Sequence, residues 1–162
     1  MEDLCERLVG SLLEEEVADD VAILVIRNEP RFAGPLRLQV PAEPSSLAAI
    51  RAALRRWLLD VGVEALDSHD IVLAATEACS NVVLHAYGTG GGFIDVEALS
   101  AEGGSAVRVT VRDRGTWRTQ TSEGGGRGFL VMRGVMDEVA VDHAAGGTVI
   151  RLWRRIRAPE RA

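Results

Sequence analysis

The chain has 162 residues, 47% of them hydrophobic, which is enough for one ordinary core and too few for two complete ones. Its net charge is −6 and no basic run is interleaved with aromatic residues, which argues against nucleic acid as a direct partner. The longest apolar runs are far shorter than a membrane span, and the acidic N-terminal stretch is unlike a secretion signal. We therefore expect a cytoplasmic protein that binds neither nucleic acid nor membrane.

The types of basic residue and the spacing of the cysteines exclude several kinds of binding site. All 18 basic residues are arginine, so nucleotide sites that depend on a lysine, such as the loop ending Gly-Lys-Ser/Thr, are excluded. The two cysteines, Cys5 and Cys79, fall in helical patterns without the spacing of a disulfide framework or a zinc site. Any nucleotide would have to be bound through other groups, and both thiols are expected to be packed.

The N-terminal part of the chain is interrupted twice by proline. Residues 3–16 have the apolar spacing of a helix, and residues 21–26 read as a buried strand. Asn28-Glu29-Pro30 and Gly34-Pro35 then break the pattern, as a linker would. The sequence thus divides into a leading segment too small for its own core, a linker, a main domain and a tail, at residues 1–27, 28–35, 36–156 and 157–162.

The main domain begins with a strand of alternating polarity and continues as a mixture of helices and strands. Apolar and polar residues alternate in the predicted strands, which gives the sheet one buried face and favours antiparallel pairing. Asp67 or Ser68 is the expected N-cap of the central helix, and Gly88 is its expected end. In chain order the patterns predict a strand, two helices, two strands, a loop, a helix and two strands, at residues 36–40, 47–59, 70–88, 93–98, 107–112, 113–128, 129–136, 139–141 and 148–153.

The central helix carries two different stripes. Its apolar stripe comprises Val72, Ala75, Cys79, Val82 and Ala86. Glu77, Asn81 and His85 recur every four residues and form a polar stripe. A carboxylate one turn from an amide can accept a proton, while the amide oxygen can join the shell of a hard cation. The alternative is an ordinary solvated face, which the helix alone leaves open.

Two further features lie near the predicted ends of strands and helices. Asp113 follows a strand and precedes Gly115, so its carboxylate could accept a hydrogen bond from an exocyclic amine such as that of adenine while the glycine admits a flat ligand. Glycines at residues 124–126 and 128 precede a helix, where backbone amides can face phosphate oxygens and the loop can act as a lid. By themselves, the first feature also fits a plain turn and the second a plain linker.

Together these motifs resemble the GHKL family of ATPases. Residues 77–87 look like the N box in the Glu-Ala-x-x-Asn-x-x-x-His-Ala-Tyr form typical of the anti-sigma-factor serine kinases. Residues 113–115 resemble the first glycine box, although Thr116 and Trp117 stand where the family has a second glycine. The second glycine box is matched by residues 126–129 with 136–139, and the closing strand by residues 147–149.

The resemblance implies an α+β fold: a two-layer sandwich whose mixed, mainly antiparallel sheet is covered on one face by helices, the Bergerat-type ATP-binding fold. It also implies ATP and Mg²⁺ as cofactors. Glu77 would be the catalytic general base, and Asn81 would hold Mg²⁺ through the ATP phosphates. The other implied nucleotide contacts are Asp113, Gly115 and Thr148 at adenine, and Gly124, Gly126, Arg127 and Gly128 at the phosphates.

The implied activity is transfer of the ATP γ-phosphate to a serine or threonine of a STAS-type anti-sigma-factor antagonist. A sigma factor is a second implied partner, and the family's sigma-binding members commonly form homodimers. A different function, an ATP-gated binding module with little or no transfer, also fits the motifs. A sensor histidine kinase would need an upstream helical hairpin with a phosphorylatable histidine, which residues 1–35 do not contain. The leading segment resembles the C-terminal end of PPM-type serine phosphatases, in which Asp19 would match a metal ligand.

Overall fold

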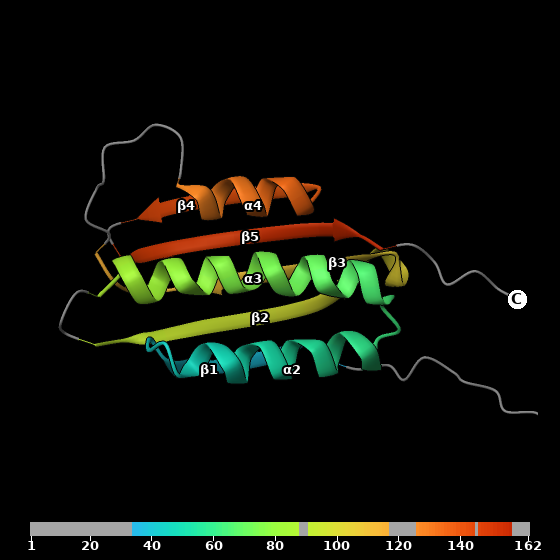
Figure 1. Cartoon of the computed structure of the whole chain (residues 1–162), viewed down its shortest axis with the longest axis horizontal. Coiled ribbons are helices and arrows are strands. Elements are labelled where there is room, and N and C mark those ends of the chain that lie inside the picture. The colour runs from blue at the N-terminus through green and yellow to red at the C-terminus, as the bar shows by residue number, and fades with distance from the viewer. Residues whose placement is uncertain (1–33, 88–90, 117–125, 145, 157–162) are drawn as a thin grey trace, which may run out of the picture.

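The protein is a two-layer sandwich of helices on a sheet. The computed structural model describes residues 34–87, 91–116, 126–144 and 146–156, and in this part of the chain three α-helices lie side by side on one face of a five-stranded sheet (Figure 1). The elements in chain order are β1 (Leu36–Pro41), α2 (Ser46–Asp60), α3 (Ala65–His85), β2 (Phe93–Ala101), the 3₁₀ helix η1 (Glu102–Gly104), β3 (Ala106–Arg112), α4 (Arg127–Val135), β4 (Glu138–Ala144) and β5 (Gly147–Arg155). The predicted α+β sandwich is confirmed.

The sheet has the strand order β1-β2-β3-β5-β4. Each neighbouring pair is antiparallel, so among the described strands the sheet is wholly antiparallel rather than mixed. Helices α2 and α3 connect β1 to β2. The chain reverses its direction before each of these two helices and again before β2, so β2 runs antiparallel to β1. The alternating polarity of the strands therefore predicted the pairing correctly.

The two faces of the sheet have different chemistry. In β2, Ile94, Val96 and Ala98 are buried beneath the helices, while the intervening residues face the other side. On that uncovered face, Glu97 accepts a hydrogen bond of 2.8 Å from Arg37 Nε, and Gln39 donates one of 2.7 Å to Asp95. Because such pairs are exposed, each contributes about 1 kcal/mol or less. The core lies entirely on the helix-covered face.

Helix α3 crosses the middle of the sheet and carries the apolar stripe expected from the sequence. All five residues of that stripe are buried, and Cys79 is fully so. Buried alanines at residues 74, 75 and 78 keep the helix close to the strands. Burial raises the pKa of the Cys79 thiol to about 12, so this cysteine is a protonated packing residue.

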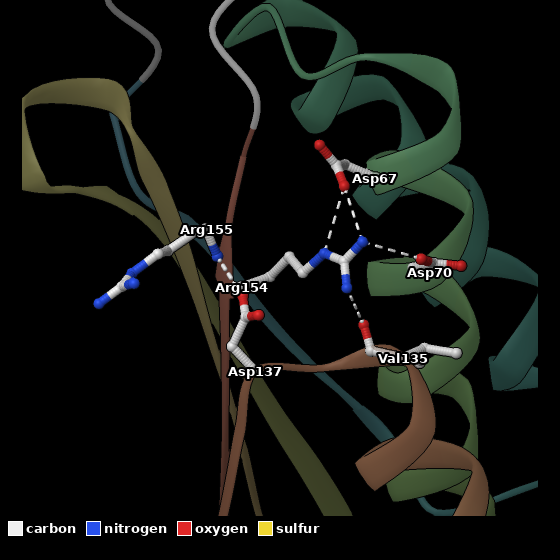
Figure 2. Close-up of polar contacts among 6 residues, drawn as sticks. All are labelled: Asp67, Asp70, Val135, Asp137, Arg154 and Arg155. Atoms are coloured by element: carbon white, nitrogen blue, oxygen red, sulfur yellow. Dashed lines mark hydrogen bonds and ion pairs between the residues drawn. The ribbon is translucent and has the colours of Figure 1, made fainter.

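The start of α3 differs from the prediction. The helix begins at Ala65, with Glu64 in the N-cap position, so neither Asp67 nor Ser68 is a cap. Asp67 is instead buried within the first turn, where its Oδ1 accepts hydrogen bonds of 3.2 and 2.9 Å from Nε and Nη2 of Arg154 (Figure 2). The position of Asp67 is therefore explained by its contact with Arg154, near the far end of the sequence, and not by its local preference for an N-cap position.

Arg154 joins three elements at this end of the sandwich. Besides Asp67, its Nη2 donates a hydrogen bond of 3.1 Å to Asp70, and its Nη1 donates one of 2.7 Å to the carbonyl of Val135 at the end of α4 (Figure 2). Burial by itself lowers the pKa of Arg154, but the hydrogen bond and charge of Asp67, with the charges of Asp70 and Asp137, outweigh it and raise that pKa above its usual range. The guanidinium is therefore a positively charged partner for the carboxylates of both Asp67 and Asp70 at neutral pH.

The remaining boundaries were predicted to within a few residues. Strands β2, β4 and β5 are longer than the sequence suggested, and α4 begins and ends slightly earlier. The indole of Trp57 donates a hydrogen bond of 2.8 Å to the carbonyl of Gly34, which fixes the end of the predicted linker against α2. Residues 1–33, including Asp19, lie outside the described residues. Within the described part of the chain, no helix combines the length and apolarity needed to cross a membrane.

Candidate nucleotide site

Glu77 and Asn81 lie on the side of α3 that faces the first turn of α4. A Cβ atom added to Gly128 would lie 2.7 Å from Oε2 of Glu77 and 3.7 Å from Oδ1 of Asn81. Both polar side chains are half-buried, as expected for groups between two helices. Two of the three residues of the polar stripe, Glu77 and Asn81, are therefore directed at the start of α4, whereas the third, His85, is exposed.

The start of α4 presents backbone N–H groups. Gly126 is the N-cap, and its carbonyl accepts a hydrogen bond of 2.8 Å from Phe129 N. None of the described side chains caps the first turn, and it contains no acidic residue. Arg127 is exposed in the same turn. The free amides, the helix dipole and the arginine all favour an anion, and phosphate groups fit this chemistry.

Asp113 lies immediately after β3 and is buried, with 4% of its surface exposed. Its Oδ1 accepts a hydrogen bond of 2.9 Å from Gly115 N and a longer one of 3.4 Å from Thr148 N. The backbone N–H of Asp113 in turn donates to the carbonyl of Thr148 at 3.0 Å. The carboxylate is thus held between the end of β3 and the start of β5.

Thr148 and Asp113 point to the same face of the sheet. Thr148 follows the alternation of the buried residues Ile150 and Leu152, and Asp113 follows that of Val111. Thr148 is 2% exposed, and its Oγ1 lies 3.1 Å from Nδ1 of His143 on β4. The residues expected at adenine are therefore neighbours on the helix-covered face.

Two glycines are required here by close backbone contacts. A Cβ on Gly115 would lie 2.0 Å from the carbonyl oxygen of Ala86, at the end of α3. A Cβ on Gly147, whose φ is +127°, would lie 1.9 Å from the carbonyl oxygen of Asp113. Both contacts involve backbone atoms, so no side chain can be accommodated without moving the chain.

Tyr87 braces the segment that contains Asp113. Its hydroxyl accepts a hydrogen bond of 2.8 Å from Arg114 N and donates one of 2.7 Å to the carbonyl of Phe93. Its ring also occupies the space beside Gly92, where a Cβ would lie 2.2 Å from the ring. The tyrosine of the predicted N box thereby joins the end of α3, the start of β2 and the segment after β3.

Together these contacts bring the predicted groups to one end of one face. Gly115 touches Ala86, and Asn81 precedes Ala86 on the same helix by roughly 7 Å of helix rise. The start of α4, the end of α3, the end of β3 and the start of β5 lie at the same end of the sandwich (Figure 1). Glu77 and Asn81 are therefore on the same side of the sheet as Asp113, as a shared ligand would require.

The described groups fit ATP with its magnesium ion. The described residues contain no group of three or more His, Cys, Asp or Glu side chains that could hold a metal by themselves. A magnesium ion here would depend on phosphate oxygens and water, with the amide oxygen of Asn81 as a protein ligand, which suits its octahedral oxygen coordination. Of the glycine-rich loop expected to act as a lid, Gly124 and Gly125 lie outside the described residues, as do residues 117–123 before them.

His143 was missed in the sequence. His143 on β4 is paired with Thr148 on β5 across the hairpin. This pairing depends on the register of the hairpin, which could not be predicted from the sequence. Tyr87 was noted only as part of a motif. The alternation of residues 139–141, extended by one step on the same face, would have pointed to His143.

The chain is similar to known proteins over most of its length. Residues 40–154 match the family model described as histidine kinase-like ATPase domain. A serine-protein kinase RsbW of Bacillus licheniformis is 32% identical over 136 residues, which cover 74% of this chain and 84% of that protein. An anti-sigma F factor of Pasteuria penetrans is 30% identical over 131 residues, which cover 72% of this chain and 86% of that protein.

A solved structure is similar over most of the described domain. The crystal structure of the RsbU and RsbW domains of a Mycobacterium tuberculosis protein superposes with a TM-score of 0.67 at 34% identity. The match covers 80% of this chain but only 34% of the solved chain. The likeness therefore concerns one part of that larger protein.

Proposed function

Because the chain belongs to the family of histidine kinase-like ATPase domains, we propose that it is an ATP-dependent serine/threonine protein kinase of the anti-sigma-factor type. Its similarity to RsbW serine-protein kinases and to an anti-sigma F factor supports this branch of the family. The observation that carries the proposal is the approach of Gly128 to both Glu77 and Asn81, since it brings a carboxylate and an amide to a helix N-terminus suited to phosphate.

Adenine would be bound at the end of β3. The carboxylate of Asp113 would accept a hydrogen bond from the adenine amine, and the Thr148 hydroxyl beside it would support the same edge. Gly115 would let the segment after Asp113 pack against the carbonyl of Ala86, which keeps the adenine-binding carboxylate at the end of α3. The hydrogen bonds from Gly115 N and Thr148 N to Asp113 already hold the carboxylate in one orientation, so little ordering is needed when the base binds.

The phosphates would lie at the start of α4. The amides of Gly126, Arg127 and Gly128 would face the phosphate oxygens, with Gly124 adding to the lid. Asn81 would hold magnesium against the same oxygens, and when bound the ion neutralises their negative charge. Phosphoryl transfer depends mainly on such positioning and charge neutralisation.

Glu77 would act as the general base. The acceptor hydroxyl loses its proton as its oxygen bonds to the γ-phosphorus, and Glu77 would receive that proton while the bond to the β-phosphate oxygen breaks. The carboxylate faces the first turn of α4 and is half-buried, so it is close to the expected phosphates and still reachable.

The acceptor would be a serine or threonine of a STAS-type anti-sigma-factor antagonist, and a sigma factor would be the second partner. We also place the protein in the cytoplasm, with self-association into a homodimer.

Residues 1–27 would be the C-terminal remnant of a phosphatase-like domain, joined by a linker at 28–35 to the kinase domain at 36–156. The support for this phosphatase-like remnant is the resemblance of Asp19 and its neighbours to the C-terminal end of PPM-type serine phosphatases.

The test is transfer of labelled phosphate from ATP to candidate antagonist proteins in the presence of magnesium. Glu77→Gln should slow transfer about 100- to 10,000-fold while ATP affinity changes little. Glu138→Gln is the matched control, because Glu138 is an exposed carboxylate on β4. Asn81→Ala should weaken binding of ATP with magnesium. Undiminished transfer by Glu77→Gln would refute the assigned base.

The second candidate function is an ATP-gated binding module without transfer. It would be favoured if the wild type binds ATP and retains its partners but transfers no phosphate to any of them. A module of this kind has no need of a general base, so the presence of Glu77 beside the start of α4 favours the kinase.

A further inference from the structure

We propose that His143 is a positioning residue that orients the Thr148 hydroxyl and thereby makes the base site select a 6-amino purine over a 6-oxo purine. The inference rests on the proposed nucleotide site. It concerns a residue on a neighbouring strand that has no direct place in that site. The carrying observation is the 3.1 Å contact between Nδ1 of His143 and Oγ1 of Thr148.

The register of the β4–β5 hairpin sets this contact. His143 is paired with Thr148, next to the pair Ala144 and Gly147 that closes the turn. His143 and Thr148 both follow the alternation of residues that pack against the core, Val141 on β4 and Ile150 on β5. Their side chains are therefore on the helix-covered face, where Asp113 also points.

Thr148 is buried, and its backbone is held against Asp113. Thr148 is 2% exposed, and its backbone N–H and carbonyl are both engaged with Asp113. A threonine hydroxyl has one proton to donate and two lone pairs. In the tautomer that carries its proton on Nε2, Nδ1 of His143 accepts the proton of the hydroxyl, and both lone pairs of Oγ1 remain for other donors.

This arrangement distinguishes the two purine bases. The 6-amino group of adenine is a hydrogen-bond donor, and the oriented lone pairs of Oγ1 and the Asp113 carboxylate are both acceptors. The 6-oxo group of guanine is an acceptor and would meet acceptors only. Without His143, the hydroxyl can rotate and donate its proton to the 6-oxo group, so the hydroxyl no longer discriminates and the Asp113 carboxylate does so alone.

The experiment is titration of the whole chain with ATP and with GTP, in the presence of magnesium and at one fixed pH. His143→Ala should reduce the ratio of ATP to GTP affinity about 3- to 10-fold, the amount expected for one neutral hydrogen bond. His143→Asn should restore much of the ratio, because its Oδ1 can accept the threonine proton near the position of Nδ1. Asp142→Ala is the control, since it removes the contact with Arg151 in the same hairpin without facing Thr148.

A double-mutant cycle isolates the pair. Thr148→Val removes the hydroxyl, and in that background His143→Ala should have no further effect on the ratio. Thermal unfolding without nucleotide measures any purely structural role. An unchanged ratio in His143→Ala, whatever the loss of thermal stability, would overturn the inference. If instead the wild type binds neither nucleotide, the proposed function itself fails.

Discussion

Gly128 lies so close to Glu77 that a methyl group on the glycine would come within 2.7 Å of the carboxylate oxygen Oε2. The atom that would be displaced is the end of a flexible side chain, not backbone. Gly128→Ala should therefore fold normally but move the carboxylate away from its position beside the start of α4.

We expect Gly128→Ala to slow phosphoryl transfer at least about 10-fold, a part of the effect of losing a general base, with a small change in ATP affinity. Gly134→Ala in the same helix is the matched control, because a Cβ there meets nothing within 4 Å. Kinetics of transfer to the acceptor protein and far-UV circular dichroism measure the two effects. Equal transfer rates in both variants would contradict the role given to this contact.

Asp113→Asn should weaken ATP binding about 10- to 100-fold, the value of a hydrogen bond to a charged group. The side-chain oxygen of asparagine can still accept from Gly115 N, so the turn should persist. Its amide nitrogen, however, would face the adenine amine as a second donor. Calorimetric titration measures the affinity, and a thermal melt without ATP measures the fold. A large loss of thermal stability at unchanged affinity would mean that the carboxylate is structural.

Arg154→Met should lower the free energy of unfolding by about 3 kcal/mol or more, because it removes one charged partner of the buried carboxylate of Asp67. ATP affinity should not change. Arg155→Met is the control, since Arg155 has an exposed side chain pointing away from the cluster and engages Asp137 only through its backbone N–H, at 2.7 Å (Figure 2). Urea denaturation compares the two. The double variant Arg154→Met with Asp67→Asn should recover part of the loss, and the absence of recovery would contradict this account.

Cys79 should not react with thiol reagents at pH 8 as long as the protein is folded. The folded pKa of about 12 lies above the value of an exposed thiol, so the stability contributed by the protonated form is complete below the unfolded pKa and is lost as the pH rises towards 12. Between about pH 9 and 12 its contribution should fall by about 1.4 kcal/mol per pH unit. Cys5→Ser should be the background for both measurements, and Cys79→Ala in it should remove this part of the pH dependence. Rapid labelling of Cys79 under native conditions would contradict its burial.

The features predicted best were those fixed by short-range patterns. The buried stripe of α3 follows from helical spacing, and the pairing of β2 with β3 follows from alternating polarity. Asp113 could be noticed because a carboxylate and a glycine follow a strand. In these cases the local sequence and the final packing require the same residues.

The features that escaped prediction depend on long-range contacts. Asp67 is of a residue type that is preferred at N-caps. Its burial inside the first turn is explained by Arg154, which lies on the last strand. The contact of His143 with Thr148 depends on hairpin register, which a short turn sets and a single sequence does not reveal. The approach of Gly128 to Glu77 depends on how α4 packs against α3.

The Arg154 cluster and Thr148 lie near opposite ends of β5, roughly 20 Å apart along the strand. Substitutions at sites this distant, with no shared partner, have independent energetic effects. The heat tolerance of this protein can therefore drift during evolution through changes at one end, while enzymatic turnover at the other end is inherited intact.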